Sequence, residues 1–219
     1  QMCIRDRPSI NKVPRKDLPQ HMQSGWDQAK ELTGDATFIE VSGNNPEVYD
    51  WYFKDFYKKL FYSDRLETSL VELVRLRLAN VHGCAFCNKG DTAHALQSGI
   101  SQEQVDSLGD YLFGPFSTRE KAALRLADEM VLNNNHGNLN SELYKELKKD
   151  FTDGEIYELG MIMAVLVGVA KFTFVFDLVD GLLLDCLLKA SLCAFCLASD
   201  SILSSSASWA ICCTASLST

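Results

Sequence analysis

Two cysteines at the start of a predicted helix are the residues of this chain best suited to chemistry. Cys84 and Cys87 are separated by two residues and directly follow a predicted helix break at His82-Gly83. At a helix N-terminus, unpaired N–H groups and the positive end of the helix dipole favour a thiolate and lower the cysteine pKa. Zinc sites use the same Cys-x-x-Cys spacing, so the pattern predicts a redox-active pair, with metal binding as the alternative.

Three titratable side chains are spaced so that they could serve this pair. Asp91 and His94 follow Cys87 by four and seven residues, which places all three on one helix face, within about 40° of each other. Glu72 stands eleven residues before Gly83, on the preceding predicted helix. If the two helices pack antiparallel, Glu72 and His94 lie at the same height, and Cys87 lies nearer the break. The spacing therefore predicts that protons pass from Glu72 to Cys87 through one of the other two side chains.

Glu72 also has a purely structural interpretation. On a helical wheel it falls opposite the main apolar arc of its helix, where it could be a solvated acid paired with Arg75 three residues on. Leu76 and Ala79 share its side, however, which indicates that this side is covered. His94 could likewise be a surface or capping histidine rather than a relay group.

The stretch from Glu72 to Gly99 resembles the alkylhydroperoxidase D-like, or carboxymuconolactone decarboxylase, family. Redox members of that family carry a glutamate, eleven residues, Cys-x-x-Cys, three residues and a histidine. Glu72, Cys84 and Cys87 match this pattern at the required spacings, whereas Asp91 occupies the position of the histidine. The resemblance extends over roughly residues 40 to 180. It implies a single all-α domain whose subunits assemble into homotrimers or hexamers.

The resemblance also implies a role for each site residue. Cys87 would be the thiolate that attacks a hydroperoxide, Cys84 the resolving thiol that closes the disulfide, and Glu72 the acid of the proton relay. His94, one turn beyond Asp91, is our candidate replacement for the missing histidine. The implied function is a thiol-dependent peroxidase and disulfide oxidoreductase. Such an antioxidant enzyme takes a hydroperoxide substrate and a lipoylated or thioredoxin-like thiol reductant.

Two other functions remain open from the sequence. The family's decarboxylase branch acts on a lactone acid, but that chemistry does not need a Cys-x-x-Cys, so the pair argues against it. The second alternative is a non-enzymatic, redox-sensing helical oligomer, because Asp91 replaces the family's histidine. No nucleotide or flavin motif appears, so we expect no cofactor.

Length and charge narrow the class of protein further. The chain has 219 residues, enough for one domain with a real core. Its net charge of −8 argues against a nucleic-acid binder, which needs a basic surface to meet phosphates. The polar start lacks the apolar segment of a secretory signal, which predicts a cytoplasmic protein without a membrane partner. A reducing cytoplasm would keep Cys84 and Cys87 as a cycling pair.

Capping boxes and helical periodicity predict that the body of the chain is all-α. The boxes are Ser101 with Gln104, Ser117 with Glu120, and Thr152 with Glu155. Asn45-Pro46 predicts the start of a helix that carries an aromatic stripe from Trp51 to Phe61. The segment from Pro8 to Gly43 is predicted as loop and short helix, anchored by Trp26 and Phe38. The last body helix is apolar on most sides, which predicts a central helix or an oligomer contact.

Both ends of the chain differ from the body in composition. Residues 1–24 are predicted as an N-terminal tail, of which about the first seven resemble a translated sequencing adapter rather than protein. Residues 25–180 are the predicted helical domain, and residues 181–219 a Leu/Ser/Cys-rich tail. We interpret this second tail as out of frame. A membrane anchor, or a zinc site that combines Cys193 and Cys196 with the first pair, are the alternatives.

Overall fold

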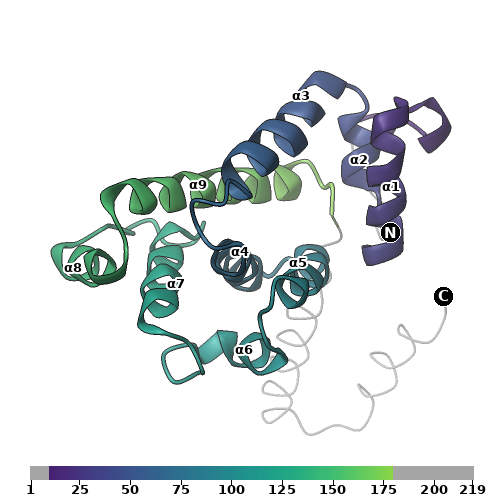
Figure 1. Cartoon of the computed structure of the whole chain (residues 1–219). Helices are drawn as coiled ribbons and strands as arrows, with labels where there is room; N and C mark the ends of the chain where they lie inside the picture. Colours follow the sequence, from purple (N-terminus) through teal and green to yellow (C-terminus); the bar gives the residue numbers. More distant parts are fainter. Residues whose placement is uncertain (1–9, 180–219) are drawn as a thin grey trace, which may run out of the picture. The chain divides into compact units, whose positions relative to one another are not determined.

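The computed structural model of the chain describes residues 10–179. This part is helical and contains no strand, which confirms the predicted all-α fold (Figure 1). η1 and η3 are short 3-10 turns and η2 is a π-helix. In chain order the elements are η1 (Arg15–Asp17), α1 (Gln20–Thr33), α2 (Thr37–Ser42), α3 (Pro46–Asp50), η2 (Trp51–Phe61), α4 (Thr68–His82), α5 (Ala85–Gln97), α6 (Gln102–Ser107), η3 (Leu108–Asp110), α7 (Thr118–Met130), α8 (Ser141–Asp150) and α9 (Asp153–Val175).

Helix α4 is the central element and packs against α5, α7 and α9 (Figure 1). One of its faces, with Leu70 and Val74, joins a cluster formed with α7, α8 and α9. Another face, with Leu73, joins a second cluster formed with α5 and α7. Because α4 is covered on nearly every side, its polar residues Glu72 and Arg75 are buried as well. The solvated interpretation of Glu72 is therefore wrong.

The turn between α4 and α5 reverses the chain at Gly83. This residue has φ 68°, a left-handed conformation in which glycine carries no Cβ penalty. The reversal makes α5 antiparallel to α4, so that Asn88 Nδ2 donates to the Ala79 carbonyl at 3.3 Å. It also leaves Cys84 as the N-cap residue of α5, directly beside the end of α4.

All three predicted capping boxes are present. In each, the Ser or Thr side chain accepts the N–H group three residues on, and the Glu or Gln there accepts the N–H of the cap. The predicted cap at Asn45 is also present, since its side chain accepts the Val48 N–H at 3.3 Å. These local signals were readable because a helix start needs its first N–H groups satisfied.

The N-terminal region is more helical than predicted. α1 extends over 14 residues, where the sequence indicated loop and short helix. Its start falls within the predicted tail 1–24, and Leu18 and Met22 are buried there with Tyr49. The helix begins after Pro19 with no side-chain cap, so the usual start signal is missing. Trp26 and Phe38, the two predicted anchors, do pack against this cluster.

The aromatic segment departs from the predicted α-helical stripe. Residues 51–61 wind as a π-helix, and the N–H of Tyr62 bonds the carbonyl of Tyr57, five residues back, at 2.8 Å. The wider turn changes which side chains point inward. Phe56 and Phe61 are buried, whereas Val48 is 57% exposed and Trp51 52% exposed. The structure therefore places part of the aromatic stripe in the core and leaves Trp51 outside it.

Helix α9 is buried at its start and more exposed towards its end. Leu159, Ile162 and Met163 are buried in the main cluster, while Phe172, Phe174 and Val175 are exposed. Within residues 10–179, α9 is the one helix long and apolar enough to cross a membrane by length and composition, a test that core helices also pass.

Several predictions concern residues outside the described range. The adapter-like first seven residues and the tail 181–219, with its cysteines at 193 and 196, lie there. The zinc alternative that uses those cysteines therefore lies outside as well. Among residues 10–179, no group of three or more Cys, His, Asp or Glu side chains is arranged to hold a metal ion.

Candidate active site

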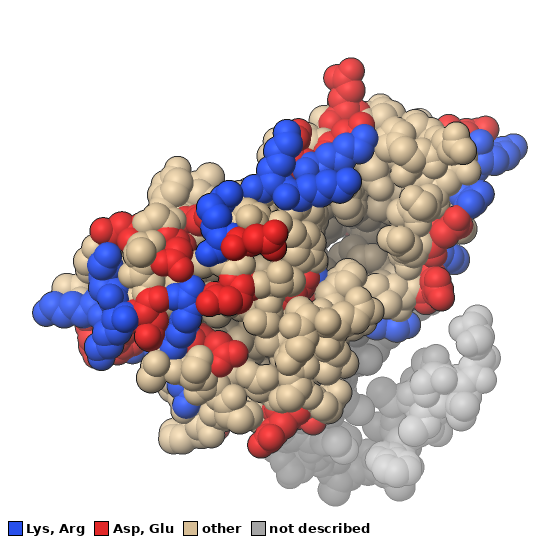
Figure 2. Space-filling model, viewed as in Figure 1, with Lys and Arg blue, Asp and Glu red and all other residues tan. Residues whose placement is uncertain are grey.

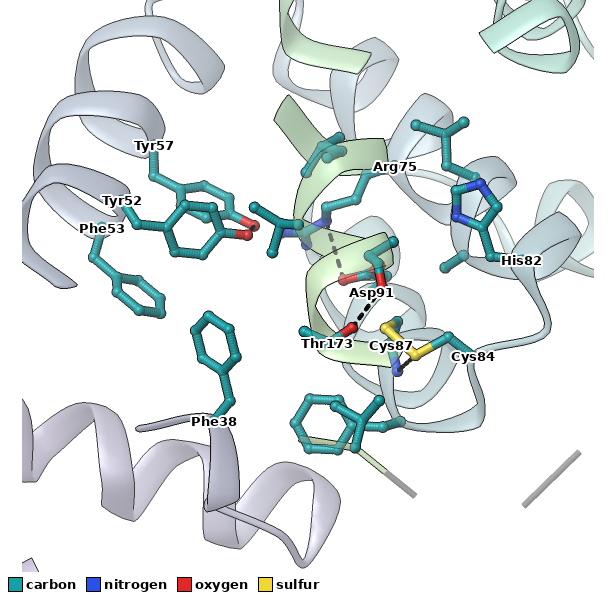
Figure 3. A pocket seen from close by; sticks show the side chains of 17 residues that line it. Phe38, Tyr52, Phe53, Tyr57, Arg75, His82, Cys84, Cys87, Asp91 and Thr173 are labelled. Carbon is teal, nitrogen blue, oxygen red and sulfur yellow. Dashed lines mark hydrogen bonds and ion pairs between the residues drawn. A yellow bond between two sulfur atoms is a disulfide. The ribbon is translucent and has the colours of Figure 1, made fainter. Parts of the chain in front are cut away.

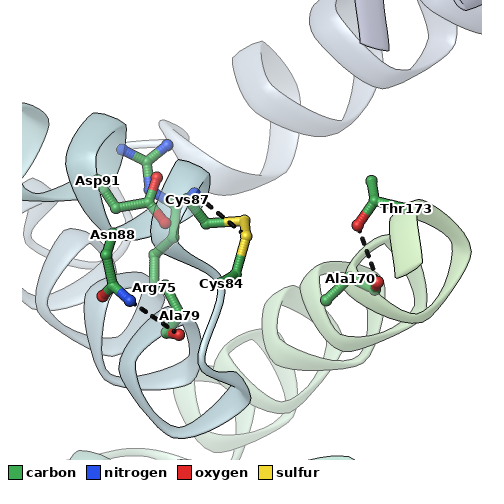
Figure 4. The surroundings of a disulfide bond; sticks show 8 residues. All are labelled: Arg75, Ala79, Cys84, Cys87, Asn88, Asp91, Ala170 and Thr173. Atoms are coloured by element: carbon green, nitrogen blue, oxygen red, sulfur yellow. Dashed lines mark hydrogen bonds and ion pairs between the residues drawn. A yellow bond between two sulfur atoms is a disulfide. The ribbon is translucent and has the colours of Figure 1, made fainter. Parts of the chain in front are cut away.

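Cys84 and Cys87 form a disulfide at the first turn of α5 (Figure 4). Their Cα atoms are 5.3 Å apart, within the usual range for a bonded pair. The Cys84 sulfur sits at the N-cap and accepts the N–H of Cys87 at 3.1 Å. Cys84 is only 1% exposed, whereas Cys87 is half-buried and reachable from its surroundings. The two sulfurs thus occupy different environments.

Arg75 contacts Glu72 of α4 as well as two polar residues of α5, and Figure 3 shows its contact with one of these, Asp91. Its Nη2 is 2.6 Å from Glu72 Oε2 and 2.7 Å from His94 Nδ1, and its Nε is 3.1 Å from Asp91 Oδ1. The predicted relay passes a proton from Glu72 to His94 or Asp91 and then to Cys87. The guanidinium of Arg75, which stays charged, lies in that path: Glu72 contacts Arg75, and Arg75 contacts Asp91 and His94.

Glu72 is deeply buried, with 2% of its surface exposed. The Tyr62 hydroxyl donates to one of its oxygens, and Arg75 contacts the other. Burial raises the pKa of Glu72, and the charge of Arg75 and the Tyr62 hydrogen bond only partly offset that effect. Arg75 therefore favours the ionised form of Glu72 and opposes the effect of burial.

Asp91 has the most strongly displaced acid pKa of the site. Burial raises the pKa of Asp91 to about 6; Arg75 lowers it and the charge of Glu72 raises it. That value lies close to the usual pKa of a histidine, about 6.5. Burial also disfavours the charge of Arg75, but Asp91, Tyr57 and Glu72 outweigh burial and keep the pKa of Arg75 above its usual value.

His94 occupies the outer end of the cluster and is exposed. Because its Nδ1 faces the Nη2 of Arg75, that nitrogen accepts a hydrogen bond and carries no proton. Burial of the ring, followed by the charge of Arg75, lowers the pKa of His94. At neutral pH His94 is therefore a neutral acceptor for Arg75.

A cavity of ≈ 200 Å³ lies against the disulfide and is mostly apolar (Figure 3). Tyr52, Phe53 and Tyr57 of η2 form one wall, with Phe38 of α2 beside them. Residues of α9 complete the wall, among them Leu166, Val169 and Thr173. Both sulfurs reach this cavity, and Arg75 and Asp91 supply its polar end. An apolar space with a few converging polar groups is the usual form of a small-molecule site.

A second cavity, of ≈ 350 Å³, lies between α1 and α5. Cys87, Asp91 and His94 all line it, as expected for residues on one helix face. Ser24, Gln28 and Thr33 of α1 line the opposite wall, which is more polar than the wall of the first cavity. We call this space the α1–α5 cleft. The surface is visibly hollowed on the face shown in Figure 2, where acidic and basic side chains are interspersed.

The sequence did not reveal two of the residues at this site. The sequence predicts Arg75 only as a partner of a solvated Glu72. The spacing of three residues between them is the one sequence signal that places Arg75 near the site. His82 was assigned to the helix break alone. It lines the cavity beside the disulfide. Its Nε2 accepts the N–H of Leu132 at 3.2 Å, which fixes the end of α4 to the segment after α7. Burial lowers the pKa of His82, so it is neutral there.

Comparison with known proteins places the centre of this fold in one family. Residues 46–129 match the model of the carboxymuconolactone decarboxylase family. The uncharacterized protein YdfG of Bacillus subtilis (strain 168) is 28% identical over 93 residues, which are 42% of this chain and 63% of that protein. The chain thus spans less than two thirds of the length of this curated relative.

Two solved structures share the fold at low sequence identity. The alkylhydroperoxidase AhpD core of an uncharacterized peroxidase-related protein from Ralstonia eutropha JMP134 superposes with a TM-score of 0.63 at 15% identity, covering 78% of this chain and 90% of that one. The debrominase Bmp8 gives a TM-score of 0.63 at 18% identity, covering 77% and 90%. The matched residues 46–129 include α4, the disulfide and all five predicted site residues, so the predicted resemblance to the carboxymuconolactone decarboxylase family is confirmed over this region, and the chain has an alkylhydroperoxidase D-like fold.

Proposed function

We propose that this protein is a thiol-dependent hydroperoxide reductase that cycles between the Cys84–Cys87 disulfide and the dithiol. The observation that carries the proposal is the placement of this disulfide. It lies at a buried helix start, in the wall of an apolar cavity that also holds a carboxyl group with a pKa near neutrality. Such a site offers a sulfur nucleophile, a proton acceptor and space for an organic substrate.

The cycle begins with the reduced pair. The Cys87 thiolate attacks one oxygen of the hydroperoxide, the O–O bond breaks, and the sulfur becomes a sulfenic acid. The other oxygen leaves as an alkoxide and takes a proton to become an alcohol. The Cys84 thiolate then attacks the sulfenic sulfur, which forms the disulfide and releases water after protonation. Two electrons from an external thiol reductant, which is itself oxidised to a disulfide, restore the dithiol.

Asp91 takes the role that the histidine has in other family members. In its ionised form it accepts the proton of the Cys87 thiol, and it then returns that proton to the departing alkoxide. A general acid–base group works best when its pKa lies near the working pH, and the pKa of Asp91 is about 6. Burial is the main cause of this raised pKa, while Arg75 lowers it and Glu72 raises it. His94 accepts a hydrogen bond from Arg75 on the outer side of the cluster. In this proposal, Cys84, Cys87 and Asp91 react, while Glu72 and His94 act through Arg75.

The cellular setting follows from the same chemistry. A cycling disulfide needs a reducing compartment, which supports a cytoplasmic location. The exposed apolar part of α9 supports a homo-oligomer, a trimer or hexamer by analogy with the family.

Stopped-flow mixing of the reduced protein with cumene hydroperoxide tests the proposed function. We expect loss of two thiols per chain and formation of one alcohol per disulfide. The Cys87→Ser variant should show no fast phase, whereas Cys84→Ser should form a sulfenic acid that accumulates. If Cys87→Ser and the wild type consume the hydroperoxide at the same rate, the proposed function is wrong.

A further inference from the structure

The two sulfurs differ in the spaces that they reach. Cys84 lines only the apolar cavity beside α9, whereas Cys87 lines both that cavity and the α1–α5 cleft. Phe86, between them in sequence, lines both spaces as well. A molecule in the α1–α5 cleft can therefore touch the disulfide at one sulfur only.

The two sulfurs also differ as leaving groups. When a thiolate attacks one sulfur of a disulfide, the other leaves as a thiolate, and a more stable thiolate leaves faster. The Cys84 sulfur accepts the Cys87 N–H at 3.1 Å at the N-cap of α5, where the helix dipole also favours negative charge. Attack at Cys87 thus expels the better leaving group. Accessibility and leaving-group stability favour the same sulfur.

We infer that the reductant is a slender thiol that enters the α1–α5 cleft, attacks Cys87 and expels Cys84. The incoming thiolate forms a bond to the Cys87 sulfur, the Cys84–Cys87 bond breaks, and Cys84 leaves with the electron pair. A second thiolate then attacks the incoming sulfur of the mixed disulfide. This step releases the reductant as its own disulfide and leaves Cys87 reduced. The inference rests on the proposed function only in requiring that the disulfide be reduced.

The chemistry of the cleft indicates what kind of thiol fits. Its volume of ≈ 350 Å³ is that of a small-molecule site. Most of its lining is apolar, and Gln28, Thr33 and His94 offer hydrogen-bonding groups along it. A small free thiol fits, and so does a thiol at the end of a flexible arm. A folded thiol protein presents its sulfur on a broad surface, which does not fit a cavity of this size. Hydroperoxides, in contrast, have the apolar cavity available on the α9 side.

A matched pair of tryptophan variants tests this route. Gln28 is exposed and lines the cleft, while Gln20 is exposed on the same helix and lines no cavity described here. Reduction of the oxidised protein by glutathione would be followed by acid quenching, alkylation and mass spectrometry. We expect Gln28→Trp to slow this reduction at least tenfold relative to Gln20→Trp. It should slow oxidation of the reduced protein by tert-butyl hydroperoxide much less.

Two further measurements locate the attack. Peptide fragmentation after a short exposure of the wild type to glutathione should find the mixed disulfide on Cys87. A thioredoxin should reduce the disulfide more slowly than glutathione at equal thiol concentration. The inference is overturned if the adduct is on Cys84, if Gln28→Trp and Gln20→Trp are reduced equally fast, or if thioredoxin is the faster reductant. Because reduction is measured without peroxide, a failure of the peroxidase proposal would appear separately, as slow oxidation of both variants.

Discussion

At the residue scale, the central feature of the site is one guanidinium shared by two carboxyl groups and an imidazole. Arg75 contacts Glu72 and Asp91 on its two sides and donates a hydrogen bond to His94. The rings of Tyr57 and Phe61 lie 6.0 Å and 5.3 Å from its central carbon, so cation–π contact adds to the ion pairs. A single cation can neutralise only one of the two buried acids. One of these acids therefore takes up a proton more readily than the acid of a simple ion pair does.

Asp91→Asn removes the group that we expect to carry this proton. In the wild type, the rate of reaction between the reduced protein and cumene hydroperoxide should rise as the pH passes through about 6, because ionised Asp91 accepts the thiol proton. In Asp91→Asn this inflection should disappear, and the rate at pH 7 should fall by about 10²-fold or more. Stopped-flow rates between pH 4.5 and 8 measure both effects. Asp110→Asn, in η3 away from the site, is the control, and an unchanged inflection in Asp91→Asn would exclude the role.

Arg75→Met should destabilise the fold and shift the titration of the site. Breaking a buried ion pair by removing one partner costs about 3–5 kcal/mol, because the remaining charge stays buried. Without Arg75, which lowers the pKa of both acids, the pKa of Glu72 and of Asp91 should rise further. A folded-state pKa above the unfolded value means that stability is highest at low pH and is lost as the pH rises. Urea unfolding at pH 5 and pH 8 should therefore show a larger deficit at pH 8. An equal deficit at both values would contradict this coupling.

At the element scale, the turn at Gly83 decides where the sulfurs lie. Its left-handed backbone ends α4 and lets α5 return alongside, which brings Asp91 to Arg75 and places Cys84 at the N-cap. Two elements that are continuous in sequence thus form one face of the site. The remaining wall comes from η2 and α9, which are far away in the chain.

Gly83→Ala tests the backbone requirement without a steric complication. A Cβ at this position meets no heavy atom within 4 Å, so the expected cost is that of the left-handed conformation, about 1–2 kcal/mol. Gly109 also has open space around a Cβ but no positive φ, and Gly109→Ala should change stability by less than that amount. Thermal or urea unfolding of the two variants decides the matter. Equal stability of the two variants would mean that an alanine at position 83 adopts this backbone conformation without strain.

Sequence patterns revealed the parts of this architecture that depend on neighbours in the chain. The capping boxes, the cap at Asn45 and the break at Gly83 are local, since each satisfies hydrogen bonds within a few residues. The burial of Arg75 and the π-helical winding of residues 51–61 depend on distant packing and could not be read from spacing. The start of α1 has no side-chain cap, so the sequence gives no signal for it. Spacing likewise predicted that the five site residues lie near each other, but it did not show that Arg75 lies between Glu72 and the residues of α5.

At the scale of the whole molecule, α9 presents an apolar face that the described residues do not cover. Tyr157 is 71% exposed and Val175 65% exposed, with Met161 and Phe172 also exposed between them. The small residues Gly160, Ala164 and Gly168 form a seam beside these side chains. A Cβ placed at Gly160 or Gly168 would meet open space, so the seam has room for a neighbour's side chains.

We expect this face to pack against a second copy of itself. If two α9 helices cross antiparallel about the point between residues 164 and 165, Met161 of one lies opposite Gly168 of the other, and Tyr157 lies opposite Phe172. Large side chains then face small ones, and aromatic rings face each other. Ala164→Asp places a charge at the crossing point, where it would be desolvated without a partner. We expect the wild type to sediment as an oligomer and Ala164→Asp to sediment with at most half its mass while keeping the same helix content by circular dichroism. Asn135→Asp adds the same charge in an exposed loop and should leave the mass unchanged. An Ala164→Asp protein of wild-type mass would mean that subunits meet through another surface.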